Sequence, residues 1–467
     1  MVSLKEILAR FRASPFAPVD IASIVFFRIA FGSLLIWHCY DYLAHDDLAR
    51  LWLEPRFLFK YYGFSWVHPW PGHWLYIHWI ALGVFAFFVA IGFCYRASAA
   101  LLCLSCTYFF LLDEACYVNH TYLICLVSFL FALIPAHRAL SVDSWLRPRL
   151  RAQTVPAWCL WLLRLQIGVV YFYGGVAKLS PDWLQGEPMR YYLGQRTEVP
   201  VIGRFFREEW MVYSASYASL LLDLLVVPLL LWRRTRVAAF CFAVFFHLMN
   251  SRLFTIGIFP WLAIAATTLF FSPSWPRRVL ALVGWRRSFT PPADSQTSPP
   301  RWLQAITLGF VIIYAAIQIL APLRHFLTPG GMEWNYAGHL FGWRMYVQAQ
   351  TVQSSFYVTN PTTGRTIRVA PAQFLNERQQ SVMAYTPDIC VQFAHYLAST
   401  LPHLGTRPLV VEARILVMIN GRKLQLYVDP TVNLAAEPRP LLRPRWLREI
   451  RDPLPPVDER YRKDDFP

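Results

Sequence analysis

The chain has 467 residues, of which 56% are hydrophobic, 16% are aromatic and only 15% are charged. This balance excludes an ordinary water-soluble protein of two or three domains and favours a protein surrounded largely by lipid. The net charge of +16 does not indicate a nucleic-acid partner, because the arginines lie in short loops between apolar segments rather than along one soluble face.

Apolar segments close to the roughly 20 residues that cross a bilayer recur through the first two thirds of the chain. With about 1.5 Å of helical rise per residue, these segments predict nine membrane-spanning helices. They lie near residues 20–42, 73–94, 97–112, 120–136, 157–178, 211–232, 237–252, 255–271 and 302–322. The segment before the first span is amphipathic, and no small-residue cleavage site follows that span. We therefore expect the first span to be retained rather than removed as a signal peptide.

The loops between these helices fall into two groups by charge. One group is rich in arginine, as at Arg147, Arg149 and Arg151, whereas the other mixes arginine with acids such as Asp46, Asp113 and Glu187. Cytoplasmic loops of membrane proteins carry an excess of Lys and Arg. We therefore expect a cytoplasmic N-terminus, and nine spans then place the C-terminal segment outside the cytoplasm.

Soluble composition returns after the last span. Strands are predicted near 351–358 and 365–370, helices near 376–385 and 388–401, and a hairpin over 410–428 that turns at Asn420-Gly421. The predicted fold is thus an α-helical polytopic membrane protein with about nine transmembrane helices and a small extracytoplasmic α+β C-terminal domain. The expected boundaries are 1–323 for the membrane domain, with a linker at 288–301, then 324–440 for the α+β domain and 441–467 for a polar, proline-rich tail.

Charged residues inside the predicted spans are costly, so their positions carry information. Arg28, Arg164 and Asp223 lie at similar depths, counted from the cytoplasmic ends of their spans. A proton path is one interpretation of such a set. We expect instead that the three side chains satisfy one another as a buried ionic cluster between helices.

A second polar set gathers at the opposite ends of the spans. Its members come from three segments: Asn119 and His120 open the fourth span, Lys178 closes the fifth, and His247 and Asn250 approach the end of the seventh. Each histidine alone would be interpreted as a hydrogen-bonded residue at a helix end. The convergence of three segments at one depth favours a functional site.

Lys178 is the most informative member of this set. The chain has 44 lysines and arginines, of which only five are lysines, and the other four lie outside the spans. A guanidinium with a pKa above about 12 cannot act as a base, whereas an amine in an apolar pocket can be neutral near pH 7. Lys178 is therefore a candidate general base, the alternative being a lysine that extends to the membrane surface from a span end.

The residues around this lysine suggest an aromatic pocket. Gly174 and Gly175 precede Lys178 by one turn, and missing side chains there leave room for a flat ligand or for another helix. His247, Asn250 and Phe254 share one helical face if the helix extends that far. Such a pocket would suit a quinone ring, although aromatic stripes also serve as packing. The nine cysteines show no zinc or disulfide spacing, so we expect no metal.

Four long motifs occur in order along the chain: LLDEACYVNHTYL (111–123), VYFYGGVAKLSPDWLQGEPM (170–189), FFHLMNSRLFTIGIFPW (245–261) and HFLTPGGMEW (325–334). Through them the chain resembles the vitamin K-dependent gamma-glutamyl carboxylases, especially bacterial members whose membrane body is called the HTTM domain. The resemblance runs from about residue 15 to residue 440 and implies a bacterial inner-membrane protein.

The resemblance implies a reaction as well. Lys178 would deprotonate reduced vitamin K, either phylloquinol or menaquinol, with help from His120, and addition of oxygen would give an epoxide and a strong base. That base would remove a γ-proton from a glutamate of a peptide or protein, and the carbanion would take up carbon dioxide. The implied quinol-binding residues are Asn119, Tyr171, Tyr173, His247, Asn250 and Phe254, and the implied substrate contacts are His325, Trp334, His339 and Trp343.

Two departures from the animal members of this family matter. Animal members carry two adjacent lysines, whereas Ala177 precedes Lys178 here. They also extend further, into a luminal region that helps to bind their substrates, so we expect weak peptide docking in this chain. The alternatives are a quinol epoxidase without carboxylation and a non-catalytic quinone-binding or transport protein. A transporter is disfavoured because the ionisable groups fall into two separate sets.

Overall fold

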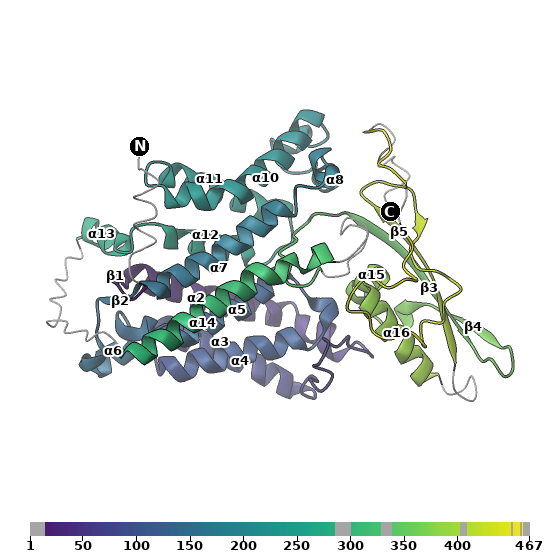
Figure 1. Ribbon diagram of the computed structural model, residues 1–467, viewed down its shortest axis with the longest axis horizontal. Coiled ribbons are helices and arrows are strands. Elements are labelled where there is room, and N and C mark those ends of the chain that lie inside the picture. Colours follow the sequence, from purple (N-terminus) through teal and green to yellow (C-terminus); the bar gives the residue numbers. More distant parts are fainter. Residues whose placement is uncertain are drawn as a thin grey trace.

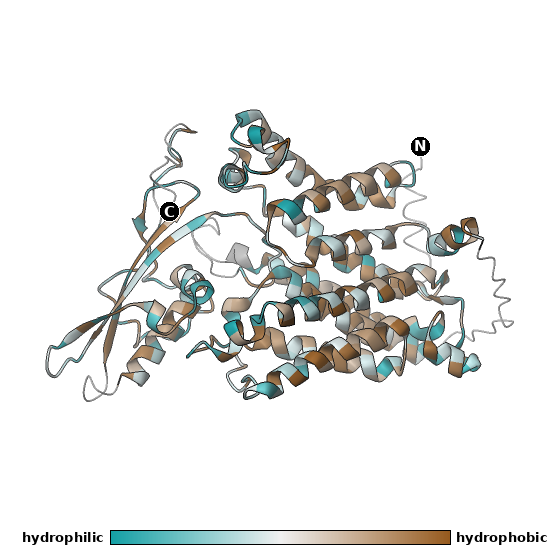
Figure 2. Ribbon diagram, turned by 180° about the vertical axis from the view of Figure 1, so that it is seen from behind, coloured by the Kyte–Doolittle hydropathy of each residue, from teal (hydrophilic) through white to brown (hydrophobic). Residues whose placement is uncertain are grey.

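The computed structural model describes residues 15–284, 300–327, 339–401, 409–449, 452–457 and Arg460. A bundle of long helices forms one end of the molecule and a sheet domain forms the other, with α15 and α16 beside the sheet (Figure 1). Figure 2 shows hydrophobic residues along the long helices and more hydrophilic residues in the sheet domain. The helical bundle and the sheet domain therefore differ in composition, and the expected domain boundaries remain predictions.

The long helices coincide with the predicted spans. They are α2 (Ala22–Ala44), α3 (His73–Ile91), α4 (Tyr95–Leu111), α5 (Asn119–Leu133), α7 (Ala157–Val176), α10 (Glu209–Leu231), α11 (Arg236–Leu253), α12 (Phe259–Thr267) and α14 (Arg301–Leu320). Short helices α6 (Val142–Leu146), α8 (Pro181–Leu184), α9 (Met189–Gly194) and α13 (Trp275–Leu282) lie in the connections. A two-stranded sheet of β1 (Pro18–Asp20) and β2 (Thr154–Pro156) joins the chain before α2 to the chain before α7.

Five helices in the described part of the chain are long and apolar enough to cross a membrane, namely α2, α3, α7, α10 and α14 with its extension to Arg324. Helices α4, α5 and α12 with its following turn are apolar but shorter. A tight turn contributes to the shortness of α4, because Gly92 ends α3 with a φ of 66° and Cys94 precedes α4 with a φ of 43°. A count of nine crossings, and which face is cytoplasmic, remain predictions.

The predicted ionic cluster of Arg28, Arg164 and Asp223 is wrong. Arg28 is fully buried and donates to the carbonyl oxygens of Ala136 at 2.6 Å and Leu140 at 2.5 Å, just after α5. Arg164 donates to carbonyl oxygens just after α12, including that of Phe271 at 3.1 Å. Carbonyl oxygens left unpaired beyond a helix end can satisfy a buried guanidinium, so neither arginine needs a carboxylate.

The C-terminal domain is an antiparallel sheet with one face covered by two helices. The strand order is β4 (Thr366–Val369), β3 (Gln350–Thr359), β5 (Val410–Ile419) and β6 (Gln425–Leu426), and the helices are α15 (Glu377–Tyr385) and α16 (Pro387–Thr400). The predicted turn is confirmed: Asn420 and Gly421 have φ values of 52° and 74°, the left-handed geometry that tight hairpins require. Trp446 and Leu447, which fall in the predicted polar tail, are buried in this domain.

The C-terminal domain packs directly on loops of the membrane domain. Phe59 and Ala115 from these loops belong to its apolar core. Gln379 of α15 donates to the carboxylate of Asp113 at 2.8 Å, and burial raises the pKa of Asp113 to about 6. This contact fixes the C-terminal domain over the end of the bundle at which α4 ends and α5 begins.

Candidate functional site

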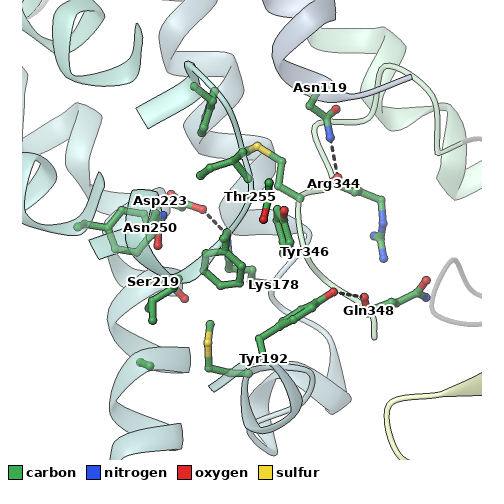
Figure 3. Close-up of a pocket in the computed structure, with 18 of the residues that line it drawn as sticks. Asn119, Lys178, Tyr192, Ser219, Asp223, Asn250, Thr255, Arg344, Tyr346 and Gln348 are labelled. Carbon is green, nitrogen blue, oxygen red and sulfur yellow. Dashed lines mark hydrogen bonds and ion pairs between the residues drawn. The ribbon is translucent and has the colours of Figure 1, made fainter. Parts of the chain in front are cut away.

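A cavity of about 900 Å³ lies where the membrane domain meets the C-terminal domain. Its walls come from the start of α5, the end of α7, the connection through α8 and α9, helices α10 and α11, the segment before β3, and α15. The cavity combines many apolar side chains with a few polar ones, which is typical of small-molecule sites. Figure 3 shows Lys178, Asp223, Asn250 and Tyr346 around it.

Lys178 follows the end of α7 and lies in the wall of this cavity with only 6% of its surface exposed. Its Nζ contacts the carboxylate of Asp223, and the carbonyl oxygen of Gly174 lies at 3.4 Å (Figure 3). The ring of Trp183 lies 5.2 Å from the same nitrogen. The side chain therefore turns back into the protein, and the alternative of a lysine extending to the membrane surface does not describe it.

Asp223 is the partner that the sequence did not reveal. It lies in α10 and is 5% exposed. If the spans ended at the same depth, as the sequence predicted, Asp223 would lie far from Lys178, near the other face of the membrane. In the structure, however, α10 begins well beyond the end of α7. The indole of Trp183, which follows α7, donates to the carbonyl of Ser216 within α10. Unequal helix ends therefore bring Asp223 level with Lys178, and an intramembrane carboxylate was the signal that could have identified it.

The two glycines before Lys178 make this meeting possible. A Cβ at Gly175 would lie 3.0 Å from the backbone nitrogen of Leu224, so α7 and α10 pack closely there. A Cβ at Gly174 would lie 3.2 Å from the carboxylate of Asp223. Gly174 and Gly175 were predicted to leave room for a flat ligand or for another helix. The structure shows the second of these, the close approach of α10.

A second polar pair lies in the same wall. The hydroxyl of Tyr171 and Nε2 of His247 are 2.7 Å apart, and His247 is 2% exposed. The other ring nitrogen, Nδ1, is buried and has no hydrogen-bond partner among the described residues. Buried polar atoms are nearly always hydrogen-bonded, so Nδ1 of His247 is an exception among the residues of the cavity wall.

The other predicted quinol contacts divide into two groups. Asn119, His120, Asn250 and Phe254 line the cavity, and Asn119 donates to the carbonyl of Arg344 at 2.7 Å. Tyr173 is not in the wall; its hydroxyl donates to the carbonyl of Ile319 in α14 at 2.5 Å. The structure therefore brings together most of this set around Lys178.

The predicted substrate contacts are less well gathered. His339 lines the cavity. Trp343 is 1% exposed and its ring lies 5.0 Å from that of Tyr122, within the apolar core. Trp334 and the side chain of His325 lie outside the described residues.

Several wall residues were not predicted. They stand on the side of the C-terminal domain and include Glu114, Tyr192, Arg344, Tyr346, Gln348 and Arg378. Tyr192 donates to the carbonyl of Gln348 at 2.7 Å (Figure 3). The rings of Phe254 and Tyr346 lie 4.6 Å apart. These residues come from loops, from α9 and from α15, where no hydrophobic pattern pointed to a site.

Glu114 lies in the loop between α4 and α5, outside the helices, and is 4% exposed. Burial raises the pKa of Glu114 to about 8, with the nearby carboxylate of Asp388 adding to the effect. Arg439 lies 3.8 Å from it. The described residues contain no group of three or more His, Cys, Asp or Glu side chains that could hold a metal ion.

Two family models match this chain. Residues 16–275 match the HTTM domain, and residues 303–452 match the lumenal domain of vitamin K-dependent gamma-carboxylase. The chain belongs to the vitamin K-dependent gamma-carboxylase family. This protein is thus an integral membrane protein of a carboxylase family, and no solved structure matches it. The second match covers the C-terminal domain.

Proposed function

We propose that this protein is a membrane enzyme that takes a proton from a reduced naphthoquinone through Lys178 and couples oxidation of that quinol to carboxylation of glutamate. The observation that carries the proposal is the buried amine of Lys178, in contact with a carboxylate, in the wall of a cavity of about 900 Å³. We also propose that the C-terminal domain lies on the extracytoplasmic side, as the arginine distribution predicts.

The residues of the cavity fit a quinol. A quinol is flat and apolar across its faces, with a hydroxyl at each of two opposite edges. The wall offers aromatic side chains, including Phe254 and Tyr346, and polar ones, including Lys178 and Asn250. When bound, the quinol supplies the electrons for reaction with oxygen, which gives an epoxide and a base strong enough to act on glutamate.

The pair of Lys178 and Asp223 explains how an amine beside a carboxylate can act as a base. An ammonium must lose a proton before it can accept one, and the carboxylate of Asp223 is in contact with Nζ to receive it. Lys178 then takes the proton of the quinol hydroxyl, so that the pair ends with one additional proton. Both side chains are buried, which keeps water from competing for this transfer.

The side of the cavity toward the C-terminal domain supports the second half of the proposal. Arg344 and Arg378 line it, and a guanidinium is well suited to hold a carboxylate. His339 and Glu114 stand in the same region. A glutamate side chain that enters between the two domains would therefore meet cationic groups before reaching the quinol.

Product analysis tests the proposal. Purified protein in lipid vesicles is given reduced vitamin K, oxygen, labelled bicarbonate and a glutamate peptide, and epoxide and fixed label are measured. We expect both products. Epoxide without fixed label would favour the epoxidase alternative, and quinone binding with neither product would favour a non-catalytic binding protein.

A further inference from the structure

A loop of the membrane domain, on the side of the C-terminal domain, holds large aromatic side chains outward. We call residues 61–74, which lead into the first turn of α3, the aromatic loop. No Asp, Glu, Lys or Arg occurs in it. Its exposed rings are those of Tyr62, Phe64, Trp66, Trp70 and Trp74, with exposed fractions between 39% and 72%. A grouped apolar surface of this kind marks a site of contact with a membrane or with another molecule.

Hydrogen bonds hold the backbone of the aromatic loop in place. Lys60 donates through Nζ to the carbonyl oxygen of Val67 at 2.7 Å. The hydroxyl of Tyr108, on α4, donates to the carbonyl oxygen of His68 at 2.8 Å and accepts from the backbone of Trp70 at 3.0 Å. Because this backbone is fixed, the loop cannot turn its rings inward without losing these bonds. The rings therefore need an apolar partner from outside the loop.

The C-terminal domain adds a second apolar surface beside the aromatic loop. Leu441 and Leu442 are 69% and 56% exposed. Two residues before them, the guanidinium of Arg439 lies 5.5 Å from the ring of Tyr62. Residues 439–445 (RPLLRPR), which we call the leucine segment, carry arginines and no acidic residue. The two domains thus place exposed apolar side chains next to each other, with positive charge on one of the two surfaces.

The aromatic loop continues the lipid-facing side of α3. This helix is long and apolar enough to cross a membrane, and Ile77 and Ile80 on it are exposed. Trp74 precedes Ile77 by about one turn. Trp and Tyr are enriched where a bilayer meets water, because the ring lies in an apolar layer while its N–H or O–H reaches water. The headgroup layer of the bilayer is therefore the partner that fits this loop.

We propose that the aromatic loop and the leucine segment insert together into the headgroup layer of the bilayer that the helices cross, with the exposed Arg445 against anionic headgroups. Lys60 joins this insertion to the contact between the domains. Its backbone N–H donates to Gln392 of α16 at 2.8 Å, and its carbonyl oxygen accepts from Arg439 at 2.6 Å. The bilayer then helps to fix the C-terminal domain over the cavity, independently of the reaction proposed above.

Spin labels at single cysteines test this insertion in the full-length protein. The exposed cysteines Cys94 and Cys241 are first replaced by serine. A nitroxide is then attached to Trp66→Cys, to Leu442→Cys or, as a control, to Thr362→Cys, in vesicles that contain phosphatidylglycerol. Thr362 is exposed in the turn between β3 and β4, at the end of the sheet domain away from the bundle (Figure 1). The melting temperature of each labelled protein shows whether it is folded.

The measurement is the ratio of collisions with oxygen, which is enriched in lipid, to collisions with a neutral nickel chelate, which stays in water. We expect this ratio to be roughly threefold or more higher at positions 66 and 442 than at position 362. Equal ratios at the three positions would overturn the inference. Labels at 66 and 442 that the chelate reaches freely until a glutamate peptide is added would also overturn it, because they would identify a peptide-binding surface.

Lipid charge gives a second measure. In vesicles of phosphatidylcholine alone, the ratio at position 442 should fall by about twofold, because the attraction between arginine and anionic headgroups is lost. Arg445→Gln should reduce this difference between the two lipids, whereas Arg414→Gln, at an exposed position on β5, should not. The same ratio in both lipids, or a full difference in the Arg445→Gln protein, would contradict the contact with anionic headgroups.

Discussion

Two buried ion pairs begin only four residues apart in the chain, yet they differ in almost every respect. Lys178 contacts Asp223 in the wall of the cavity. Asp182, on α8, receives two hydrogen bonds from the guanidinium of Arg422, at 2.7 and 2.8 Å, and a third from the amide of Asn420 at 2.8 Å. In the Lys178–Asp223 pair, the amine of Lys178 can still donate a hydrogen bond to a ligand. In the Asp182–Arg422 pair, the carboxylate of Asp182 is surrounded by donors held in place.

The difference shows how the type of cation separates chemistry from structure. A guanidinium keeps its proton and binds a carboxylate in a rigid two-point geometry, while an amine can give its proton away. The Asp182–Arg422 pair joins the hairpin of the C-terminal domain to the segment just after Lys178. The Asp182–Arg422 pair therefore holds the segment in place, whereas the Lys178–Asp223 pair moves protons in the proposed function.

The largest effect is expected when the lysine of the Lys178–Asp223 pair is replaced by arginine, the cation of the Asp182–Arg422 pair. Lys178→Arg keeps the charge but cannot accept a proton, so quinol epoxidation should fall by on the order of 10² to 10⁴. Epoxide formation by the purified variant is the measurement. Lys423→Arg, at an exposed position, is the matched control and should retain activity. Near-normal epoxide formation by Lys178→Arg would remove the base assignment.

The second largest effect is expected when the carboxylate of Asp223 is removed. Asp223→Asn keeps the shape and a hydrogen-bond acceptor but cannot receive the proton of Lys178, so kcat should fall by roughly 10- to 100-fold. If the two residues act as a unit, adding Asp223→Asn to Lys178→Arg should cause almost no further loss. Additive losses in kcat would show that Asp223 acts independently of Lys178.

Removing the Asp182–Arg422 pair should mainly lower the stability of the folded protein. Arg422→Ala leaves the carboxylate of Asp182 buried without its main partner, which costs about 3 to 5 kcal/mol. The melting temperature of the purified protein should therefore drop clearly. Arg414→Ala, at an exposed position on β5 of the same hairpin, is the control and should shift it little. Equal shifts for the two variants would mean that the Asp182–Arg422 pair does not hold the domains together.

The smallest effect is a pH dependence away from both pairs. Because the pKa of Glu114 is raised to about 8 in the folded protein, folding retains a proton that the unfolded chain loses above its ordinary pKa of 4.5. Glu114 thus contributes stability below about pH 4.5 that is lost as pH rises through about 8. Glu114→Gln should flatten the fall in melting temperature between these pH values. A variant with the same slope as the parent protein would contradict this assignment.

The sequence predicted the elements well and several contacts poorly. Apolar length located a helix in each of the nine predicted segments of the described chain, and turn chemistry located the hairpin at Asn420-Gly421. The convergence of Asn119, His120 and Lys178 on one cavity followed from placing span ends at one depth. The same assumption failed for Asp223, because α10 extends beyond the end of α7. The hydrophobic pattern of a helix does not reveal how far that helix extends past its neighbour.

The Asp182–Arg422 contact also sets an order in which parts of the fold can be completed during synthesis. Its two residues are 240 positions apart in the chain. At the usual rates of translation, that separation corresponds to a delay of about 10 to 50 s between emergence of the two residues from the ribosome. Until the hairpin is made and reaches α8, the segment after Lys178 lacks this anchor, so this part of the fold is completed only after residue 422 has been translated.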